Sequence, residues 1–507
     1  MIAVAESIAL VGMDGHPVDV EVSVAPGLPT FTIVGLPDAS IQEARERVRA
    51  AVQASREEWP MQRITVNLSP AHLRKAGSGF DLAIALGIMV ARDRIEQERL
   101  RKVCVLGELS LDGTVRRIRG VLSAAFAAAY AGARTLLVPA GNAREAALMH
   151  DIEVVPIEHL SQAVGFFRDE CSIEPVAPTR DAATRDPVDV DLSDVRGQAS
   201  AKVALEVAAA GGHNLLMIGP PGGGKTMLAR RLPTILPALS DEEAFEVTRV
   251  HSVAGLLGDD AGFIRARPFR APHHSASSTG LIGGGSGLPH PGEISLAHRG
   301  VLFLDEFGEF RNEVLQSLRQ PLEDGVVTIV RARWAVTYPA RFQLVAGSNP
   351  CPCGGARDDR GECVCSTQRV RQYLERLTGP VIDRIDIQIR VPRIEKEDLF
   401  AAERGEASAT VRARVEQARA IQRARWARKG FGSNAEMPAR DIEVLARLTR
   451  DARARVEGAV DEQKLSARGA HRVIRLARTI ADMEGADEVD MLHVSEAIGL
   501  RVPDPTL

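Results

Sequence analysis

The sequence is poor in aromatic residues, in cysteine and in excess positive charge. Only 4% of its 507 residues are aromatic, which argues against wide stacking surfaces for nucleic-acid bases. Six cysteines are too few for a disulfide scaffold. The formal net charge of -4 excludes a chain that is basic throughout, so any nucleic-acid site must be local.

Long apolar runs are also missing. The best candidate for a membrane span, residues 80–91, is too short and contains Asp81. The N-terminus carries an early acid, Glu6, and no basic region, so it lacks the form of a signal peptide. These absences predict a cytoplasmic protein with no membrane partner.

The remaining composition is that of a globular protein with several domains. Hydrophobic residues make up 45% of the chain and charged residues 26%, and 507 residues are too many for a single core. We expect an α/β multidomain fold. Its predicted parts are an α/β segment over 1–171, a linker over 172–193, a parallel α/β core over 194–392 and a helical segment over 393–507. Helices in the last part are expected over 410–428, 438–450, 467–483 and 490–500.

A glycine-rich stretch after an apolar strand dominates the core. It fits G-x-x-x-x-G-K-[ST] at every fixed position, and such glycines let backbone N–H groups approach phosphate oxygens. Lys225 can reach the β- and γ-phosphates, and Thr226 can ligate Mg²⁺. We therefore predict an ATP–Mg²⁺ site rather than a turn with a chance Lys-Thr pair. The motif consists of Gly219, Pro220, Pro221, Gly222, Gly223, Gly224, Lys225 and Thr226.

Two later strands supply polar groups for the same site. The apolar residues 301–304 end in Asp305 and Glu306, as expected of a buried parallel strand beside a nucleotide. Asp305 would hold the Mg²⁺ shell and Glu306 would polarise the attacking water. The strand 342–346 leads to Asn349, which can orient that water against the γ-phosphate. A strand-terminal turn asparagine is the alternative for Asn349.

Four cysteines cluster within residues 351–365. Cys351 and Cys353 form one C-x-C pair, Cys363 and Cys365 a second, and nine residues separate the pairs. Four thiolates at this separation can close a tetrahedral Zn²⁺ site of structural rather than catalytic character. Because C-x-C is tighter than the usual C-x₂₋₄-C spacing, free thiols remain the alternative.

A hairpin over residues 326–340 precedes the strand that leads to the candidate asparagine. Arg331, Arg333 and Trp334 fall near its tip, and basic residues beside an aromatic ring suit phosphate contact plus base stacking. We predict DNA contact there, with a solvated hairpin as the alternative. A glycine-rich loop over residues 280–287 comes before the acidic strand.

The N-terminal segment resembles the proteolytic domain of Lon in a degenerate form. The matching runs are residues 75–81, 107–113 and 120–132. Lon uses a Ser–Lys dyad, whereas the matching positions here hold Gly79 and Ala124. The resemblance implies a Lon-like scaffold or nucleic-acid-binding domain without peptidase activity.

Two arginines take their predicted roles from a resemblance to AAA+ proteins. The run 379–386 is similar to a D-R-[FI]-D segment in which Arg384 would act as an arginine finger on a neighbour's ATP. The alternative for Arg384 is a salt bridge to an adjacent aspartate. The start of the helix 467–483 is similar to the sensor-2 element, with Arg468 as the first candidate and Arg472 as the second; solvated arginines are the alternative.

Over nearly its whole length the chain resembles the magnesium-chelatase-like AAA+ proteins of the ComM/YifB family. The most specific stretches are residues 208–214, 269–274, 292–298 and 349–354. The resemblance implies a Lon-like N-terminal domain, an AAA+ P-loop core and a helical lid. It further implies a cytoplasmic homo-hexamer that uses ATP on DNA, at branched or single-stranded/duplex junctions. Recombinase or single-strand-binding proteins would be its further partners.

Three functions compete for this sequence. The first is a DNA motor that drives branch migration and heteroduplex extension in recombination and natural transformation. The second is a magnesium-chelatase-type ATPase that remodels a metal-insertion complex, and the third is an ATP-dependent protease. The missing dyad argues against the protease. The N-terminal domain and the cysteine cluster argue against the chelatase subunit, which is expected to lack both, so we expect the DNA motor.

Overall fold

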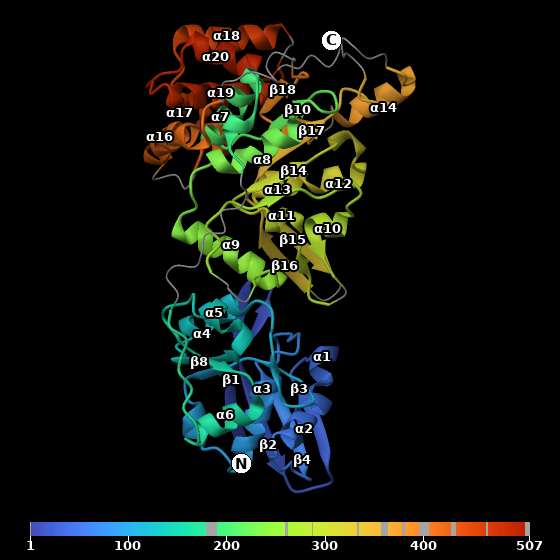
Figure 1. Ribbon diagram of the computed structural model, residues 1–507, viewed down its shortest axis with the longest axis vertical. Coiled ribbons are helices and arrows are strands. Elements are labelled where there is room, and N and C mark those ends of the chain that lie inside the picture. Colours follow the sequence, from blue (N-terminus) through green and yellow to red (C-terminus); the bar gives the residue numbers. More distant parts are fainter. Residues whose placement is uncertain are drawn as a thin grey trace.

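A computed structural model shows the chain as three parts stacked along one long axis. Figure 1 places an N-terminal α/β unit (blue to cyan) at one end, a second α/β unit in the middle and C-terminal helices (orange to red) at the other end. In the part of the chain that is described, no helix has both the length and the hydropathy to cross a membrane. The structure describes residues 2–178, 190–258, 262–285, 287–331, 334–355, 363–377, 381–394, 405–426, 432–462 and 465–501.

The N-terminal unit is built around a mixed sheet of seven strands. Their order is β3-β4-β2-β1-β5-β8-β9, with antiparallel pairing of β1 with β2 and of β2 with β4, and parallel pairing elsewhere. Helix α3 (Asp81–Ala91) is buried along its whole length and packs against β1 and β2, which accounts for its apolar sequence. The strands are β1 (Ile2–Val11), β2 (Asp14–Ala25), β3 (Thr30–Val34), β4 (Arg63–Ser69), β5 (Val103–Val105), β8 (Thr135–Pro139) and β9 (Glu153–Ile157).

The middle unit contains an all-parallel sheet of five strands in the order β11-β14-β17-β10-β18. Every residue of β14 and β17 is buried, as expected of parallel strands that are covered on both faces. This sheet fits the expected parallel α/β core. Its strands are β10 (Leu215–Ile218), β11 (Phe269–Arg270), β14 (Val301–Leu304), β17 (Gln343–Ser348) and β18 (Ile387–Arg390).

The described C-terminal residues form helices. The single helix expected over 438–450 is wrong, because Arg447 adopts a left-handed conformation with φ +50° and ends α17. A new helix, α18, then begins after Thr449, whose hydroxyl accepts from the backbone N–H of Ala452. The helices are α16 (Ser408–Trp426), α17 (Ile442–Ala446), α18 (Arg450–Asp461), α19 (Ala467–Met483) and α20 (Met491–Gly499).

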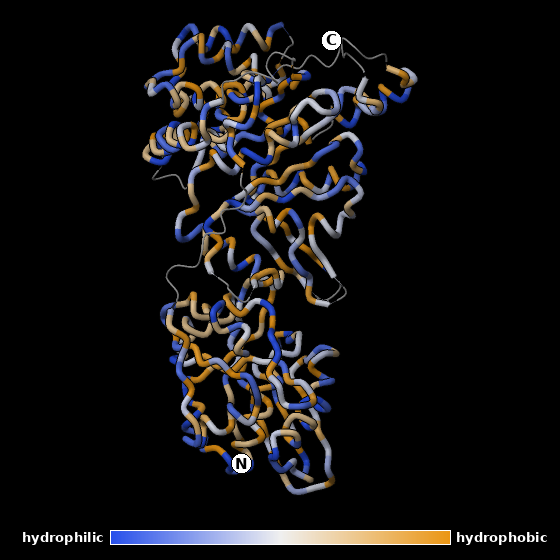
Figure 2. The backbone as a smooth tube through the Cα atoms, viewed as in Figure 1, coloured by the Kyte–Doolittle hydropathy of each residue, from blue (hydrophilic) through white to orange (hydrophobic). Residues whose placement is uncertain are grey.

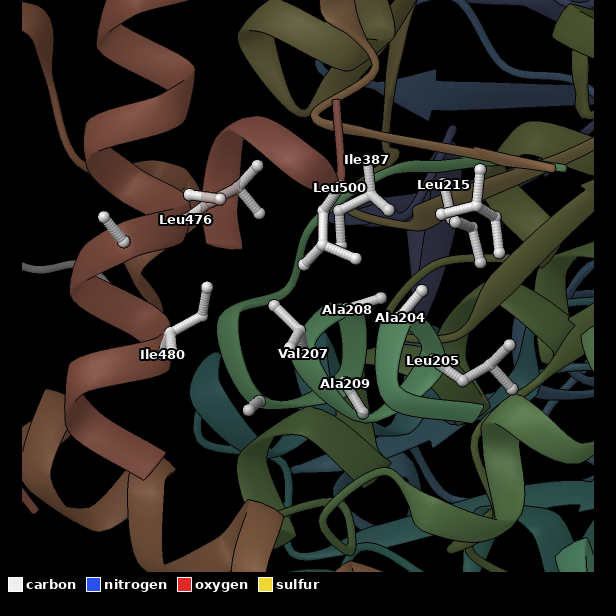
Figure 3. Close-up of a cluster of buried hydrophobic side chains, with 14 of the residues drawn as sticks. Ala204, Leu205, Val207, Ala208, Ala209, Leu215, Ile387, Leu476, Ile480 and Leu500 are labelled. Carbon is white, nitrogen blue, oxygen red and sulfur yellow. The ribbon is translucent and has the colours of Figure 1, made fainter. Parts of the chain in front are cut away.

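The N-terminal unit and the middle unit have hydrophobic cores of their own, and Figure 2 shows hydrophobic stretches in all three parts of the chain. The core between the parallel sheet and the C-terminal helices is drawn in Figure 3, where Leu476 and Ile480 of α19 face Val207 of α7 (Ala199–Gly211). Alanines dominate the buried face of α7, and small side chains let helix and sheet approach closely. The C-terminal helices therefore share a core with the sheet.

The N-terminal unit is docked on the middle unit rather than only tethered to it. Helix α9 (Asp241–Ala254) packs on α4 (Val121–Tyr130). Phe126 and Phe245 meet there with ring centroids 5.5 Å apart, and the guanidinium of Arg249 lies over both rings. The same arginine donates to Ser123 Oγ at 3.2 Å. Residues 179–189 of the predicted linker lie outside the described ranges.

Candidate functional site

The glycine-rich stretch forms a loop between β10 and α8 (Lys225–Ile235). Gly222 and Gly224 have φ values of +78° and +88°, which favour glycine. Gly219 is constrained by space instead, since a Cβ there would lie 2.0 Å from the carbonyl oxygen of Val391. The loop thus has the backbone freedom and the helix N-terminus that phosphate binding requires.

Lys225 connects the loop to the neighbouring strand. Its Nζ donates to the carbonyl oxygens of Gly219 at 2.6 Å and Pro220 at 3.0 Å, and to Asn349 Oδ1 at 3.2 Å. Burial lowers the pKa of Lys225 below its ordinary value. The structure therefore brings the motif lysine and Asn349 into direct contact, although 124 residues separate them in sequence.

The two acids follow β14 at the same carboxyl edge of the sheet. Thr226 Oγ1 donates to Asp305 Oδ2 at 2.6 Å, so the two oxygen ligands expected for Mg²⁺ converge. Glu306 adopts a left-handed conformation with φ +52°, which is uncommon outside glycine, and its N–H donates to Asp305 Oδ1 at 3.0 Å.

His274 contacts the candidate catalytic glutamate, a relation that the sequence analysis did not find. His274 Nδ1 lies 2.7 Å from Glu306 Oε2. Strands β11 and β14 pair in parallel with Phe269 opposite Val301, so continuing the same register brings His274 beside Glu306. The pairing of β11 with β14 would therefore have predicted the contact between His274 and Glu306, but the sequence alone does not give that pairing.

Gln198, to which the sequence assigned no contact with the phosphate loop, holds that loop from outside. Its Nε2 donates to the carbonyl oxygen of Gly223 at 3.2 Å and to that of Pro392 at 2.7 Å. Gln198 precedes α7 and has φ +55°. Its two contacts could not be predicted from the sequence, because Gly223 and Pro392 lie in distant segments.

The two AAA+-type arginines lie together, and they lie at the opposite edge of the sheet. Arg384 ends the short helix η5 (Ile382–Arg384), immediately before β18, and its guanidinium donates to Glu323. Arg384 and Arg468 line one pocket of about 310 Å³. The other lining residues are Glu323, Asp383, Ala439, His471, Arg472 and Arg475.

Buried polar contacts fix this arginine-rich edge. Asp386 receives a hydrogen bond from Arg472 and lies 3.2 Å from His213 Nδ1. Burial alone would raise the pKa of Asp386, but the hydrogen bond with His213 and the charge of Arg472 hold it well below the usual range. The carboxylate is therefore ionised and anchors α19 to the start of β18.

The predicted DNA-contact residues lie on a two-stranded ribbon of β15 (Val326–Arg331) and β16 (Trp334–Pro339). Arg331 is exposed and pairs with the half-buried Trp334, while Arg333 lies outside the described residues. The short strand β12 (Gly283–Gly284) packs on this ribbon, since a Cβ on Gly284 would lie 3.4 Å from Arg331 Nη2. The glycine-rich loop and the hairpin tip are thus neighbours.

The four cysteines converge, as a metal site requires. All four Sγ atoms lie within 4.8 Å of one another, and Cys351, Cys353 and Cys363 are separated by 3.3, 3.7 and 3.7 Å. A tetrahedral Zn–S distance of 2.3 Å corresponds to S···S edges of about 3.8 Å, so the thiols have the required spacing. The N–H of Gly355 is the main group that lowers the pKa of Cys353 to about 6.

Family comparisons agree with this architecture. A model described as magnesium chelatase, subunit ChlI matches residues 191–399, and its C-terminal counterpart matches residues 405–501. A third model, subunit ChlI of Mg-chelatase, matches residues 20–142. A parallel sheet with a phosphate loop and two strand-terminal acids, matched by these models, defines a magnesium-chelatase-like P-loop ATPase.

Relatives match almost end to end. The competence protein ComM of Haemophilus influenzae is 42% identical over 507 residues, covering 99% of this chain and 97% of the relative. The uncharacterised protein YifB of Escherichia coli is 41% identical over 500 residues, covering 98% and 97%. An uncharacterised protein of Mycobacterium tuberculosis is 45% identical over 495 residues, again covering 98% and 97%. The chain belongs to the ComM/YifB family of magnesium-chelatase-like proteins, which confirms the resemblance found in its sequence.

Proposed function

We propose that the protein is a homo-hexameric DNA motor that uses ATP hydrolysis to drive branch migration and heteroduplex extension in recombination, including natural transformation. The observation that carries this proposal is that the candidate nucleotide site and the candidate arginine finger lie at opposite edges of the parallel sheet. The phosphate loop and the acids lie at the carboxyl edge of the parallel sheet, and the candidate finger Arg384 lies at the amino edge. The competence name of a full-length relative supports the transformation role.

The residues at the carboxyl edge fit Mg²⁺–ATP. Gly222 has open space where a side chain would begin, and Thr226 and Asp305 offer adjacent oxygen ligands. When bound, Mg²⁺ supplies charge neutralisation at the β- and γ-phosphates. Glu306 polarises the attacking water, and Asn349 and Lys225 orient it and the γ-phosphate from the neighbouring strand.

The position of Arg384 supports a shared site in a ring. The N–H of Asp386 donates to Asn214 O at 3.1 Å, which places η5 beside the residue that precedes β10. The phosphate loop follows the four residues of β10, a distance of about 13 Å at 3.3 Å per residue. An arginine at one edge of the sheet serves an ATP at the other edge only if that ATP belongs to a neighbouring subunit.

Two elements of the middle unit support the proposal that the motor acts on DNA. The hairpin tip exposes Arg331, and the glycine strand β12 lies against it. Arg331 is suited to a phosphate and Trp334 to a base. Because the net charge of the chain is -4, a DNA site must be confined to a small basic region, and the hairpin tip is such a region.

The chelatase-type alternative keeps one observation in its favour. The N-terminal residues 20–142 match a model that bears the chelatase subunit's name, so the presence of an N-terminal domain does not separate the two functions. The basic and aromatic hairpin tip favours the DNA motor. A direct assay of DNA dependence distinguishes them.

The local geometry supports the expected lack of peptidase activity. Gly79 and Ala124 occupy the positions that correspond to the Lon dyad. A serine and a lysine close to Gly79 in the sequence have other partners: Ser78 Oγ donates to Glu108, and the buried Lys75 Nζ donates to Leu68 O at 2.8 Å. Ser78 and Lys75 therefore do not form the Ser–Lys hydrogen bond that a peptidase dyad needs.

We also propose that the cysteine cluster holds one structural Zn²⁺. The Sγ separations carry this proposal, since they approach the edges of a tetrahedral thiolate site. Inductively coupled plasma mass spectrometry of purified protein should find about one zinc per chain. A chain that carries far less than stoichiometric zinc would contradict the site.

The decisive assay for the motor is ATP-driven migration of a four-way DNA junction. We expect wild type to migrate the junction and to show DNA-stimulated ATP hydrolysis, and Glu306→Gln to bind ATP but do neither. Glu309→Gln is the matched control, because this exposed acid lies three residues further along the chain. If wild type shows neither DNA-stimulated hydrolysis nor migration, the DNA-motor proposal fails.

A further inference from the structure

We infer that the four-cysteine centre clamps the phosphate loop, so that zinc occupancy sets the affinity of the protein for ATP. This inference rests on the proposed ATP and zinc sites and joins them. Neither the motif of the loop nor the spacing of the cysteines indicates such a connection, because 124 residues lie between Thr226 and Cys351 in the sequence.

The direct contact is between Gly354 and Pro221. A Cβ on Gly354 would lie 2.6 Å from both Cγ and Cδ of Pro221, so the glycine backbone rests against the proline ring of the phosphate loop. Gly354 also has φ +76°, and its N–H donates to Cys351 O at 2.9 Å. The turn that carries the first two thiols therefore presses on the loop.

A second contact comes from the residues just before the cysteines. Asn349 Oδ1 accepts from Lys225 Nζ, and Cys351 follows only two residues later. Cys351 is fully buried. One short segment, 349–354, thus contacts both the flank and the lysine of the phosphate loop.

The second pair of cysteines attaches the same segment to the acidic edge. Helix α14 (Thr367–Leu377) begins two residues after Cys365, and its Tyr373 hydroxyl lies 2.9 Å from Ser348 Oγ. Gly308, two residues after Glu306, packs on the ring of Tyr373, because a Cβ there would lie 2.4 Å from it. A metal that binds both pairs fixes β17, α14 and the phosphate loop against one another.

This arrangement has a thermodynamic consequence. Four ligands from two chain segments close a loop around the metal, which reduces the number of conformations open to segment 349–354. A phosphate loop held against a fixed surface is preorganised, and preorganisation strengthens binding. Loss of zinc releases segment 349–354, and with it both the Pro221 contact and the position of Asn349.

The test separates the clamp from the metal by keeping all four thiols. In Gly354→Ala the new methyl group would collide with Pro221, and we expect the Kd for trinitrophenyl-ATP, measured by fluorescence, to rise about tenfold with zinc content unchanged. Gly485→Ala is the matched control. Gly485 has a similar φ of +72° but nothing within 4 Å of the added carbon, so its Kd should equal that of wild type. A Gly354→Ala protein with wild-type affinity overturns the clamp.

Zinc removal tests the other half of the inference. Cys365→Ser, and wild type stripped by a chelator, should lose zinc and show the same rise in Kd, and zinc added back to the stripped wild type should restore affinity. Circular dichroism of each sample reports whether the fold persists. Folded, zinc-free protein that binds trinitrophenyl-ATP as tightly as the loaded form overturns the control by zinc.

A double variant makes the contact itself visible. Pro221→Ala removes the ring carbons that Gly354→Ala would strike, so the double variant should bind trinitrophenyl-ATP more tightly than Gly354→Ala alone. A double variant that binds no better than Gly354→Ala contradicts the contact. Failure of wild type to bind the nucleotide at all would instead refute the proposed ATP site, and wild type without zinc would refute the proposed metal.

Discussion

The two edges of the parallel sheet differ in the charge they offer and in how it is held. At the carboxyl edge, oxygen ligands and one lysine converge. Thr226 donates a hydrogen bond to Asp305, and Lys225 donates one to Asn349. At the amino edge, arginines surround a pocket and face acids, with Arg384 on Glu323. In the proposed function, the carboxyl edge receives a phosphate and a metal ion, and the amino edge supplies the positive charge of Arg384.

Under the proposed function, this difference means that the chain carries two halves of a hydrolysis site rather than one complete site. The parallel register keeps the halves apart, since η5 precedes β18 while the phosphate loop follows β10. Both halves are anchored rigidly, the first by buried strands and the second by Asp386 beneath the pocket. The proposed ring requires that the amino edge of one chain meets the carboxyl edge of the next.

The largest effect is expected at the amino edge. Arg384→Ala should lower the kcat of ATP hydrolysis by about 10³-fold, the lower end of the effect of arginine fingers in GTPases, and leave nucleotide affinity nearly unchanged. Steady-state ATPase assays and trinitrophenyl-ATP titration measure the two quantities. Arg371→Ala, which removes an exposed arginine of α14, is the control. A fall in kcat of less than threefold would contradict the role of the amino edge in ATP hydrolysis.

At the carboxyl edge, Glu306→Gln should lower kcat by about 10² to 10⁴-fold, because the amide cannot take up the proton of the attacking water. The ring should still assemble and bind ATP, which gel filtration and fluorescence titration report. Retained hydrolysis in this variant would remove Glu306 from the proposed role.

A smaller effect is expected for His274→Ala. The imidazole fixes one carboxylate oxygen of Glu306 at 2.7 Å, so its loss should lower kcat about fivefold with little change in KM. His274→Asn, which keeps a donor at the Nδ1 position, should recover part of the rate. His273→Ala is the control, because His273 Nδ1 bonds to Ser275 Oγ instead. An equal loss in the control would reduce the histidine pair to a packing role.

The smallest effect, with the opposite sign, is expected for Glu323→Gln. Arg384, whose side chain is only 10% exposed, must leave the largely exposed Glu323 to reach a neighbour's phosphate, and the solvent around that acid weakens the attraction between them. We expect kcat to rise by no more than about threefold in the same ATPase assay. A fall as large as that of Arg384→Ala would mean that Glu323 positions the arginine rather than competes for it.

Local patterns of the sequence were enough to predict which residues gather at the carboxyl edge, while the catalytic roles of these residues stay predictions. The phosphate loop and Asp305 are recognisable because a strand, a turn and a helix follow one another directly in the chain. Such short-range patterns can be read from the sequence without knowledge of the fold. Asn349 follows from the same rule, since the ends of parallel strands meet at one edge. The cysteine cluster was predictable as a group for the same reason, although its metal remains a prediction.

Contacts between distant segments could not be predicted. His274 reaches Glu306 only through the register of β11 and β14, and Gln198 reaches the loop through a backbone that no motif marks. The expected helix over 438–450 is wrong because the left-handed Arg447 and the cap at Thr449 override a continuous helical composition. Tertiary packing decided each of these cases.

The most direct measurement of the central claim is ATP hydrolysis by mixed rings. Arg384→Ala and Lys225→Ala subunits are inactive alone by this account, but a mixed ring contains an intact phosphate loop beside an intact arginine. Mixing the two should therefore restore a substantial fraction of the wild-type ATPase rate, with a maximum near equal proportions. Mixed rings that assemble, as shown by differently tagged subunits that co-purify, and yet remain inactive at every ratio would contradict the shared site.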